Sequence, residues 1–310
     1  MKKFSFLVVL SVPFLLMSCN GSSSRKPKVK VSSKDFVTKL VSEAKANDIL
    51  KGEGLNSSKE GFAKYEVASN TYVTVSGTKT TLDPTKMEGS VNAGIDIENK
   101  TMRTELKSKE TLNGEEKSTS QTFFAQQSSE GFVEGSVTNK TYSLDSDIPS
   151  FEDAIKNINK QITSFDLDSY VNKVSENSKL LEMLDQKFSF SIVGSAYLIE
   201  MKDTTISYAD IFAVIKEFVP EATYSFPFDG DIHLNGKISL NLTSGKESAN
   251  VDIKATATLT ANKDAYVSAD LIELKPGDTL SGEGVIKAEA SIKPLSSPIK
   301  PIDLSGYTKI

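Results

Sequence analysis

Hydrophobic residues occupy every second position along much of this 310-residue chain. The pattern covers most of residues 61–144, for example residues 91–97, where Val, Ala and Ile alternate with Asn, Gly and Asp. It returns near the C-terminus in residues 232–242, 251–259 and 286–292. A period of two with one apolar and one polar side predicts antiparallel strands that have one buried face and one solvated face.

Short polar sequences separate these runs where hairpin turns are needed. Asn113-Gly114 favours a two-residue turn of type I′, because Asn and Gly adopt positive φ at low cost. Further turns are expected near Asn99-Lys100 and Asn139-Lys140. The whole pattern predicts about eleven or twelve strands.

Other segments change to the period of about 3.6 residues that is typical of helices. The expected helices cover residues 36–51 with Ser33 as the N-cap, residues 151–162 behind a capping box at Ser150–Asp153, residues 167–185, and residues 207–220. The last of these ends at Pro220 and is apolar around most of its circumference. Such a helix must be buried in a core or border an apolar cavity.

Five residues of that helix are therefore candidates for the wall of a ligand cavity. They are Ile211, Phe212, Ile215, Phe218 and Val219. Ordinary core packing is the commoner role of such an apolar stripe, and both interpretations stay open at this point.

Long antiparallel strands with a few helices predict an α+β fold, in which helices cover one face of a large curved antiparallel β-sheet. We expect a single α+β domain over residues 34–292, because no long polar linker interrupts that range. Residues 293–310 contain Pro294, Pro298 and Pro301, and proline cannot donate to a strand ladder. The sequence therefore predicts an irregular C-terminal tail.

The first eighteen residues have the pattern of an export signal. Lys2 and Lys3 precede an apolar stretch of about fourteen residues, which is short for a membrane-spanning helix. This stretch runs into Leu16-Met17-Ser18-Cys19, which resembles the lipobox of bacterial lipoproteins. The resemblance implies cleavage after Ser18, a diacylglyceryl thioether on the Cys19 sulfur, and acylation of the new amino group.

The lipobox resemblance implies a membrane anchor on Cys19 and a location in the bacterial cell envelope. Asn20 follows the cysteine, and by the same resemblance it permits the outer membrane in an organism with two membranes; otherwise the outer face of the cell membrane is expected. Residues 19–33 are polar and rich in Ser, which predicts a flexible tether between lipid and domain. Residues 1–18 are the expected signal peptide.

The composition argues against several classes of function. Loss of Lys2 and Lys3 with the signal peptide changes the net charge from −5 to −7, and such an acidic chain is a poor partner for nucleic acid. Cys19 is the only cysteine, so no disulfide is expected within the domain. His233 is the only histidine, which leaves too few ligands for a typical zinc site.

Catalytic motifs are also missing from the sequence. Gly194-Ser195 lies in an apolar run that predicts a strand, and it lacks the second glycine of a nucleophile elbow. The acidic pairs Asp145/Asp147, Asp166/Asp168 and Asp229/Asp231 stand near expected turns, which explains them without a metal. Gly282 and Gly284 lack the lysine of a phosphate-binding loop. We therefore expect a protein that is not an enzyme and needs no cofactor.

The order of elements resembles lipoproteins of the LolA/LppX type, and the strand-turn-strand sequence Asp96–Arg103 is similar to one common in their sheets. The resemblance implies an incomplete barrel whose helices close an apolar cavity, and hence a lipid or another apolar molecule as ligand. The alternative is a surface-displayed structural or protein-interaction lipoprotein with a solid core. A carrier needs a cavity, whereas a display protein does not.

Overall fold

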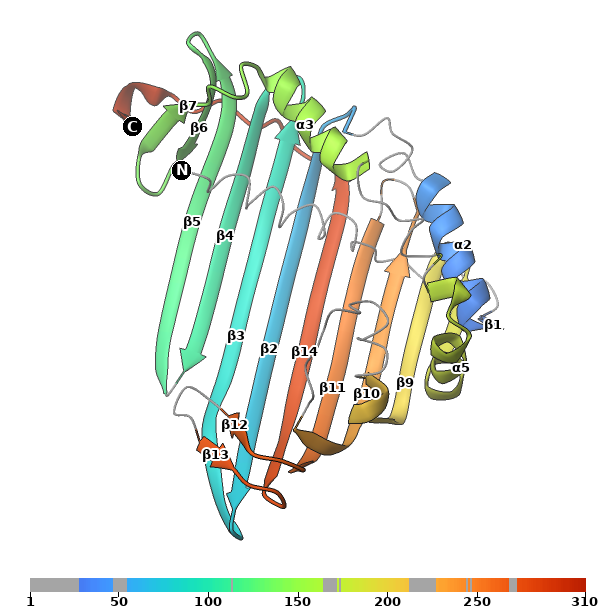
Figure 1. Ribbon diagram of the computed structural model, residues 1–310. Coiled ribbons are helices and arrows are strands. Elements are labelled where there is room, and N and C mark those ends of the chain that lie inside the picture. The colour runs from blue at the N-terminus through green and yellow to red at the C-terminus, as the bar shows by residue number, and fades with distance from the viewer. Residues whose placement is uncertain are drawn as a thin grey trace.

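The computed structural model describes residues 28–46, 55–112, 114–163, 172, 174–211, 227–243, 245, 247–267 and 272–310 (Figure 1). Within these residues the dominant feature is one large curved antiparallel sheet that does not close into a barrel. The α+β class and the open, curved sheet expected from the sequence are therefore confirmed.

Thirteen of the described strands form this sheet. Its order is β1 (Val29–Val31), β8 (Ser189–Val193), β9 (Ala196–Ser207), β10 (Phe228–Asn241), β11 (Glu247–Ala261), β14 (Thr279–Pro294), β2 (Lys59–Val75), β3 (Thr78–Asp96), β4 (Thr101–Leu112), β5 (Glu115–Ser128), β6 (Gly131–Ser136), β7 (Thr141–Leu144) and β15 (Thr308–Lys309). Only the β7–β15 pair is parallel. Two antiparallel meanders, β2–β7 and β8–β11 with β14, meet where β14 pairs with β2.

The hairpin turns agree with the sequence pattern. Leu112 pairs with Glu115, which leaves a two-residue turn in which Gly114 has φ +75°. Lys100 and Lys140 adopt φ near +50° in the two other expected turns. One expectation was wrong: Gly194 and Ser195 form the turn between β8 and β9 instead of lying inside a strand. Glycine supplies the φ of +62° that this turn needs.

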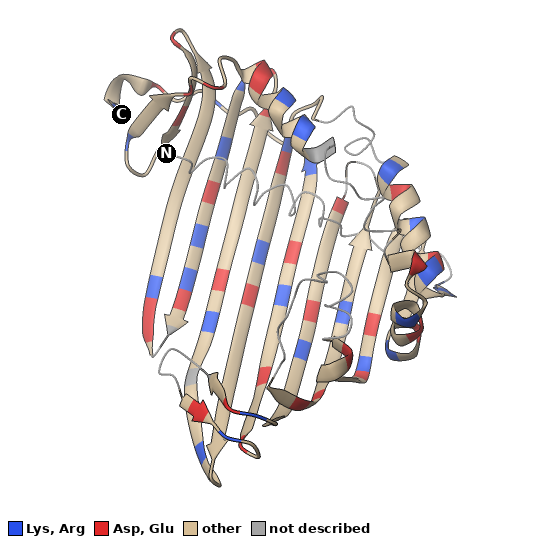
Figure 2. Ribbon diagram, viewed as in Figure 1, with Lys and Arg blue, Asp and Glu red and all other residues tan. Residues whose placement is uncertain are grey.

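Alternation along the strands gives the sheet two chemically different faces. The first, here called the apolar face, carries Ala63, Tyr65, Val67, Met87, Val91, Leu106, Ile232, Leu234, Ile238, Val251, Ile253, Ala255, Ile286, Ala288 and Ala290. The opposite side, the polar face, carries most of the charged strand residues. Figure 2 shows these charges as separate bands along the long strands. Exposed ion pairs such as Lys254–Glu283 cross between neighbouring strands on that face.

Helices α2 (Ser33–Ala46) and α5 (Ser178–Lys187) pack on the apolar face at the β8–β9 end of the sheet (Figure 1). Phe36 of α2 contacts Phe190 and Tyr197, with ring centroids 5.1 and 5.4 Å apart. The N-cap expected at Ser33 is in fact Ser32, whose Oγ accepts a hydrogen bond from the Asp35 amide at 3.1 Å. Ser33 is buried within the first turn, and its amide donates to Asp185 of α5 at 2.6 Å.

Helix α3 (Phe151–Thr163) packs on the apolar face at the other end of the sheet. The predicted capping box is confirmed, because Ser150 Oγ accepts from the Asp153 amide at 3.1 Å and donates to the Asp153 carboxylate. Phe151 and Ala154 are buried against Ala125 and Phe132 of β5 and β6. The local sequence thus sets where the helix begins, and the aromatic contacts hold it on the sheet.

A third cluster closes the end of the sheet opposite α3, where the short hairpin β12 (Ala265–Val267) and β13 (Ile272–Leu274) lies (Figure 1). Leu274 and Val73 are fully buried there together with Ala261. All three clusters lie on the apolar face, and each lies near an end or an edge of the sheet. Their buried residues leave the middle of the long strands outside the core.

The C-terminal tail follows β14 and packs on the polar face. Its residues cross the ends of β2, β3, β4 and β5 before Thr308–Lys309 pairs with β7 as β15. Gln126 anchors it twice, since its side chain accepts from the Ile302 amide at 2.7 Å and donates to the Ile302 carbonyl at 2.9 Å. The tail is therefore less irregular than its prolines suggest, because a 3-10 turn (Leu304–Gly306) and a strand end it.

Candidate functional site

The middle of the apolar face is the first candidate site. Its side chains form rows of directly paired residues across neighbouring strands, which we call the central rows. One row is Ile253, Ile286, Val67 and Met87, and the next is Ile238, Val251, Ala288 and Tyr65. None of these eight residues is charged, although the first row continues beyond Met87 to Glu110 of β4.

The central rows remain partly open to solvent. Ile286 is 47% exposed and Met87 is 39% exposed, although both lie on the face that carries the helices. Covering a side chain of this kind stabilises a protein by about 1.5–3 kcal/mol. Large exposed apolar patches mark binding surfaces in soluble proteins. The central rows therefore have the chemistry of a surface that takes up an apolar molecule.

Small residues beside the central rows leave space for a ligand on this surface. Gly284, Ala255 and Ser69 form a row next to that of Ile286. An added Cβ at Gly284 would meet nothing closer than the Ala68 carbonyl oxygen at 3.6 Å. The run of Ala and Gly at apolar positions of β11 and β14 was visible in the sequence. The pattern indicated the face of each residue but not that no described helix covers this part of the face.

The structure describes only one of the six site residues predicted from the sequence. Ile211 is half-buried and is the last described residue of a helix that begins at Tyr208, where Ser207 Oγ accepts from the Asp210 amide at 3.0 Å. Cys19, Phe212, Ile215, Phe218 and Val219 lie outside the described residues.

The histidine and the acidic pairs that the sequence analysis considered for catalysis have structural roles where they are described. His233 is exposed on the polar face and bonds to Thr205 Oγ1 at 2.9 Å, as expected for the polar side of a strand. Asp145 accepts from the Asp147 and Ile148 amides, which confirms its turn role. Asp229 and Asp231 are exposed within β10 instead of a turn, and Asp166 and Asp168 lie outside the described residues.

Glu134 on β6 lies in a second candidate site, a cavity of about 330 Å³ between α3 and the sheet, here called the α3 cavity. Its walls include Phe132, Ile158, Asp145, Asp147 and Lys160. Burial and the nearby charge of Asp145 raise the pKa of Glu134 to about 7. A carboxylate in this position costs free energy when it ionises beneath the helix.

Replacing Glu134 with glutamine is expected to stabilise the protein above neutral pH. The raised pKa means that the folded protein loses stability as the pH rises from about 4.5 to 7, on the order of 2 kcal/mol after allowance for partial exposure. Urea unfolding should show that gain for Glu134→Gln at pH 8 and little change at pH 5. The exposed control Glu98→Gln should change neither value. An equal effect of Glu134→Gln at both pH values would contradict a role for this ionisation.

The described residues lack two further features. No cluster of three or more His, Cys, Asp or Glu side chains there has the arrangement of a metal site. No helix in the same part of the chain is both long and apolar enough to cross a membrane.

Comparisons with known proteins add little to this geometry. No family model matches the chain, and no curated protein matches it significantly. An N-terminal dehydratase of the difficidin assembly line aligns at 7% identity over 87% of this chain and 94% of that one, with a TM-score of 0.09. An inactive mutant of the CurJ dehydratase with Compound 21 aligns at 9% identity over 90% and 88%, with a TM-score of 0.10. TM-scores this low establish no shared fold.

Proposed function

We propose that this protein is a non-enzymatic bacterial lipoprotein, anchored through lipid on Cys19, that holds a lipid or another apolar ligand against the central rows. One observation carries the ligand-binding part: the row through Ile286 and Met87 is apolar and partly exposed on the helix-bearing face. The anchoring part is supported by the lipobox-like sequence that ends at Cys19.

The shape and chemistry of the face favour an acyl chain over a polar ligand. The rows present Ile, Val, Ala and Met without a charged group, so a ligand gains mainly by leaving water. Each methylene that is covered contributes about 0.8 kcal/mol. A flexible hydrocarbon can follow the strands along Gly284, Ile286 and Ala288, where the side chains are small or apolar.

Binding can be tested with a variant that fills the face without disturbing the fold. A Cβ added at Gly284 has space, and the backbone there is ordinary strand, so Gly284→Leu places an isobutyl group beside the central rows, next to Ile286. We expect the purified full-length protein to bind the fluorescent fatty acid cis-parinaric acid, and Gly284→Leu to weaken that binding about tenfold or more. Fluorescence titration measures both values.

The matched control is Val285→Leu, one residue along the same strand on the polar face. It adds one methylene and should leave the affinity unchanged. Absence of fatty-acid uptake by the unmodified protein, or equal affinity in Gly284→Leu, would contradict the carrier proposal. The alternative of a solid display or protein-interaction lipoprotein would then be favoured.

A further inference from the structure

The edge of the sheet beside β5 is only partly covered. β6 pairs with Phe123–Ser128 of β5 and ends there, whereas β5 itself begins at Glu115. The stretch Glu115–Gln121, here called the β5 edge, pairs with β4 and has no described strand on its other side. In Figure 1 this part of β5 runs along the open side of the sheet, well past the end of β6. All of its residues are exposed.

The β5 edge presents unpaired backbone groups at every second residue. Thr122, the next residue along the strand, turns both of its backbone groups away from β4, since its amide donates to Thr138 Oγ1 at 2.9 Å and its carbonyl accepts from the Val137 amide at 2.8 Å. In an antiparallel strand the N–H and C=O of one residue point to the same side, and that side alternates along the chain. The unbroken register with β4 carries this alternation back along the edge. The residues that direct N–H and C=O groups outward, here called the outward residues, are Glu116, Ser118 and Ser120.

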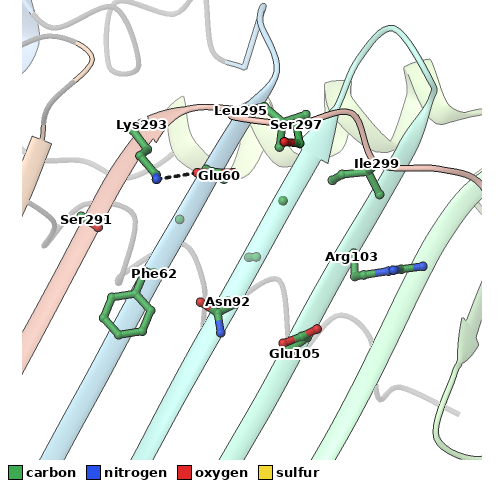
Figure 3. Close-up of a pocket in the computed structure, with 13 residues that line it drawn as sticks. Glu60, Phe62, Asn92, Arg103, Glu105, Ser291, Lys293, Leu295, Ser297 and Ile299 are labelled. Atoms are coloured by element: carbon green, nitrogen blue, oxygen red, sulfur yellow. Dashed lines mark ion pairs between the residues drawn. The ribbon is translucent and has the colours of Figure 1, made fainter.

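The side chains of the outward residues lie on the polar face. Figure 3 shows Asn92 and Glu105 on that face, and Thr122 of β5 continues their row. Side chains two positions apart in a strand share a face, so the outward residues lie on the same face as Thr122. None of the three is apolar. The β5 edge therefore offers the backbone and polar contacts of an added strand, and it offers no surface to a hydrophobic ligand.

The turn after β6 sets the upper end of the open edge. Val137 and Thr138 already use the backbone groups of Thr122, so an added strand fits along the β5 edge but not beyond it. The edge of a second copy of this chain has the matching length. It fits when the two edges lie antiparallel about a two-fold axis at Ser118, because each strand then ends where the turn of the other begins.

This register is better than its neighbours. Each outward residue pairs with an outward residue of the second copy and exchanges both backbone hydrogen bonds with it. An axis at Lys117 would instead place two lysines directly opposite each other, which is unfavourable. An axis at Thr119 would place Glu116 opposite Thr122, whose backbone groups are already bonded.

The charges along the chosen register are complementary. Glu116 of the second copy faces Ser120, and Ser120 lies directly beside Lys107 of β4. Lys107 has no ion pair within the described part of the chain, so its ammonium is available to that carboxylate across the short serine. On the other face Lys117 is opposite Thr119 of the second copy. No like charges stand directly opposite one another in this arrangement.

We propose that the β5 edge is a homodimer interface, in which two copies of this chain join their β5 strands antiparallel about a two-fold axis at Ser118. The sheet of one copy then continues into the sheet of the other. An unrelated extended peptide would meet the same backbone groups, but the second copy also brings Glu116 to Lys107. The interface lies at an edge of the sheet and does not depend on ligand binding at the central rows.

Cysteine cross-linking tests both the contact and its register. Residues that exchange hydrogen bonds in an antiparallel ladder have Cα atoms about 5.5 Å apart, which a disulfide can span. The full-length Cys19→Ser protein has no other cysteine. In that background Ser118→Cys should form a disulfide-linked dimer in about half of the chains or more on mild oxidation with copper phenanthroline. Ser120→Cys is the matched control and should cross-link about tenfold less, because two copies of residue 120 are not opposite each other.

A proline at the same position tests the backbone contact. The Ser118 amide points away from β4, so Ser118→Pro removes no hydrogen bond of the described sheet, and edge strands accept proline in such positions. In analytical ultracentrifugation the full-length Cys19→Ser protein should sediment as a dimer at micromolar concentration. Ser118→Pro should raise the dissociation constant of that dimer about tenfold or more, whereas Ser118→Ala, which keeps the amide, should leave it unchanged.

Three outcomes would overturn the proposal. One is a monomer at all concentrations, which would mean that the charged residues of the β5 edge guard it against pairing. Another is equal cross-linking of Ser118→Cys and Ser120→Cys. The third is a dimer that Ser118→Pro leaves intact, which would place the contact on another surface.

Discussion

Replacing Cys19 with serine is expected to release the protein from the membrane into the soluble fraction. If the thioether and the amino group of Cys19 carry acyl chains, each buried methylene contributes about 0.8 kcal/mol to anchoring, and two or more chains hold a protein stably where one does not. The serine hydroxyl cannot form the thioether. We expect a change from about nine-tenths membrane-bound to about one-tenth or less.

Cell fractionation with metabolic labelling by a radioactive fatty acid measures this effect. The label should be present on the unmodified protein and absent from Cys19→Ser. Ser24→Ala, a nearby change in the predicted tether, serves as the control and should keep both label and membrane location. Membrane retention of an unlabelled Cys19→Ser protein would show that another part of the chain provides the anchor.

Replacing Asp96 with alanine is expected to destabilise the fold by about 3 kcal/mol. Asp96 is buried at the end of β3, and its carboxylate accepts from the Asn99 amide at 3.1 Å, the Asn99 side chain at 2.7 Å and the Ile299 amide at 2.9 Å. Burial pushes the pKa of Asp96 upward, but these hydrogen bonds outweigh burial and hold it below the usual value. The substitution leaves those donors without their acceptor.

Urea unfolding at neutral pH measures this loss, and limited proteolysis should show faster cleavage in the C-terminal tail. The control is Asp303→Ala, which removes an exposed carboxylate that accepts from the Ser305 amide at 3.0 Å in the same tail. It should cost about 1 kcal/mol or less. Because the pKa of Asp96 is lowered, its contribution is present above about pH 4 and is lost on further acidification. A loss of less than about 1 kcal/mol in Asp96→Ala would contradict this role.

Asp96 also joins the turn after β3 to the C-terminal tail, because it accepts from the Asn99 and Ile299 amides. The Asp96→Ala variant should therefore loosen the tail, while the central rows on the other face keep their fatty acid. Limited proteolysis and fatty-acid titration of the same variant would separate these two effects.

Local sequence determined much of the architecture. The period of two placed residues such as Val91 and Arg103 on opposite faces, and the structure confirms that assignment. The Asn-Gly turn at Gly114 and the capping box at Ser150 were also predictable, because backbone conformation and hydrogen bonds between near neighbours create them. The sequence predicted Ser33 as the N-cap of the first helix. In the structure the Ser33 amide donates to Asp185 of another helix, and the neighbouring Ser32 is the N-cap.

The tertiary structure alone decided how distant segments combine. The pairing of β14 with β2 joins Ile286 to Val67, and no local pattern encodes that neighbour. This pairing creates the central rows and places Ser291 beside Phe62 on the polar face. Arg103 acquires its buried, unpartnered Nε only once the sheet and the tail have assembled around it. Sequence periodicity sets which side of a strand a residue faces, whereas strand order and tail packing decide what lies opposite it.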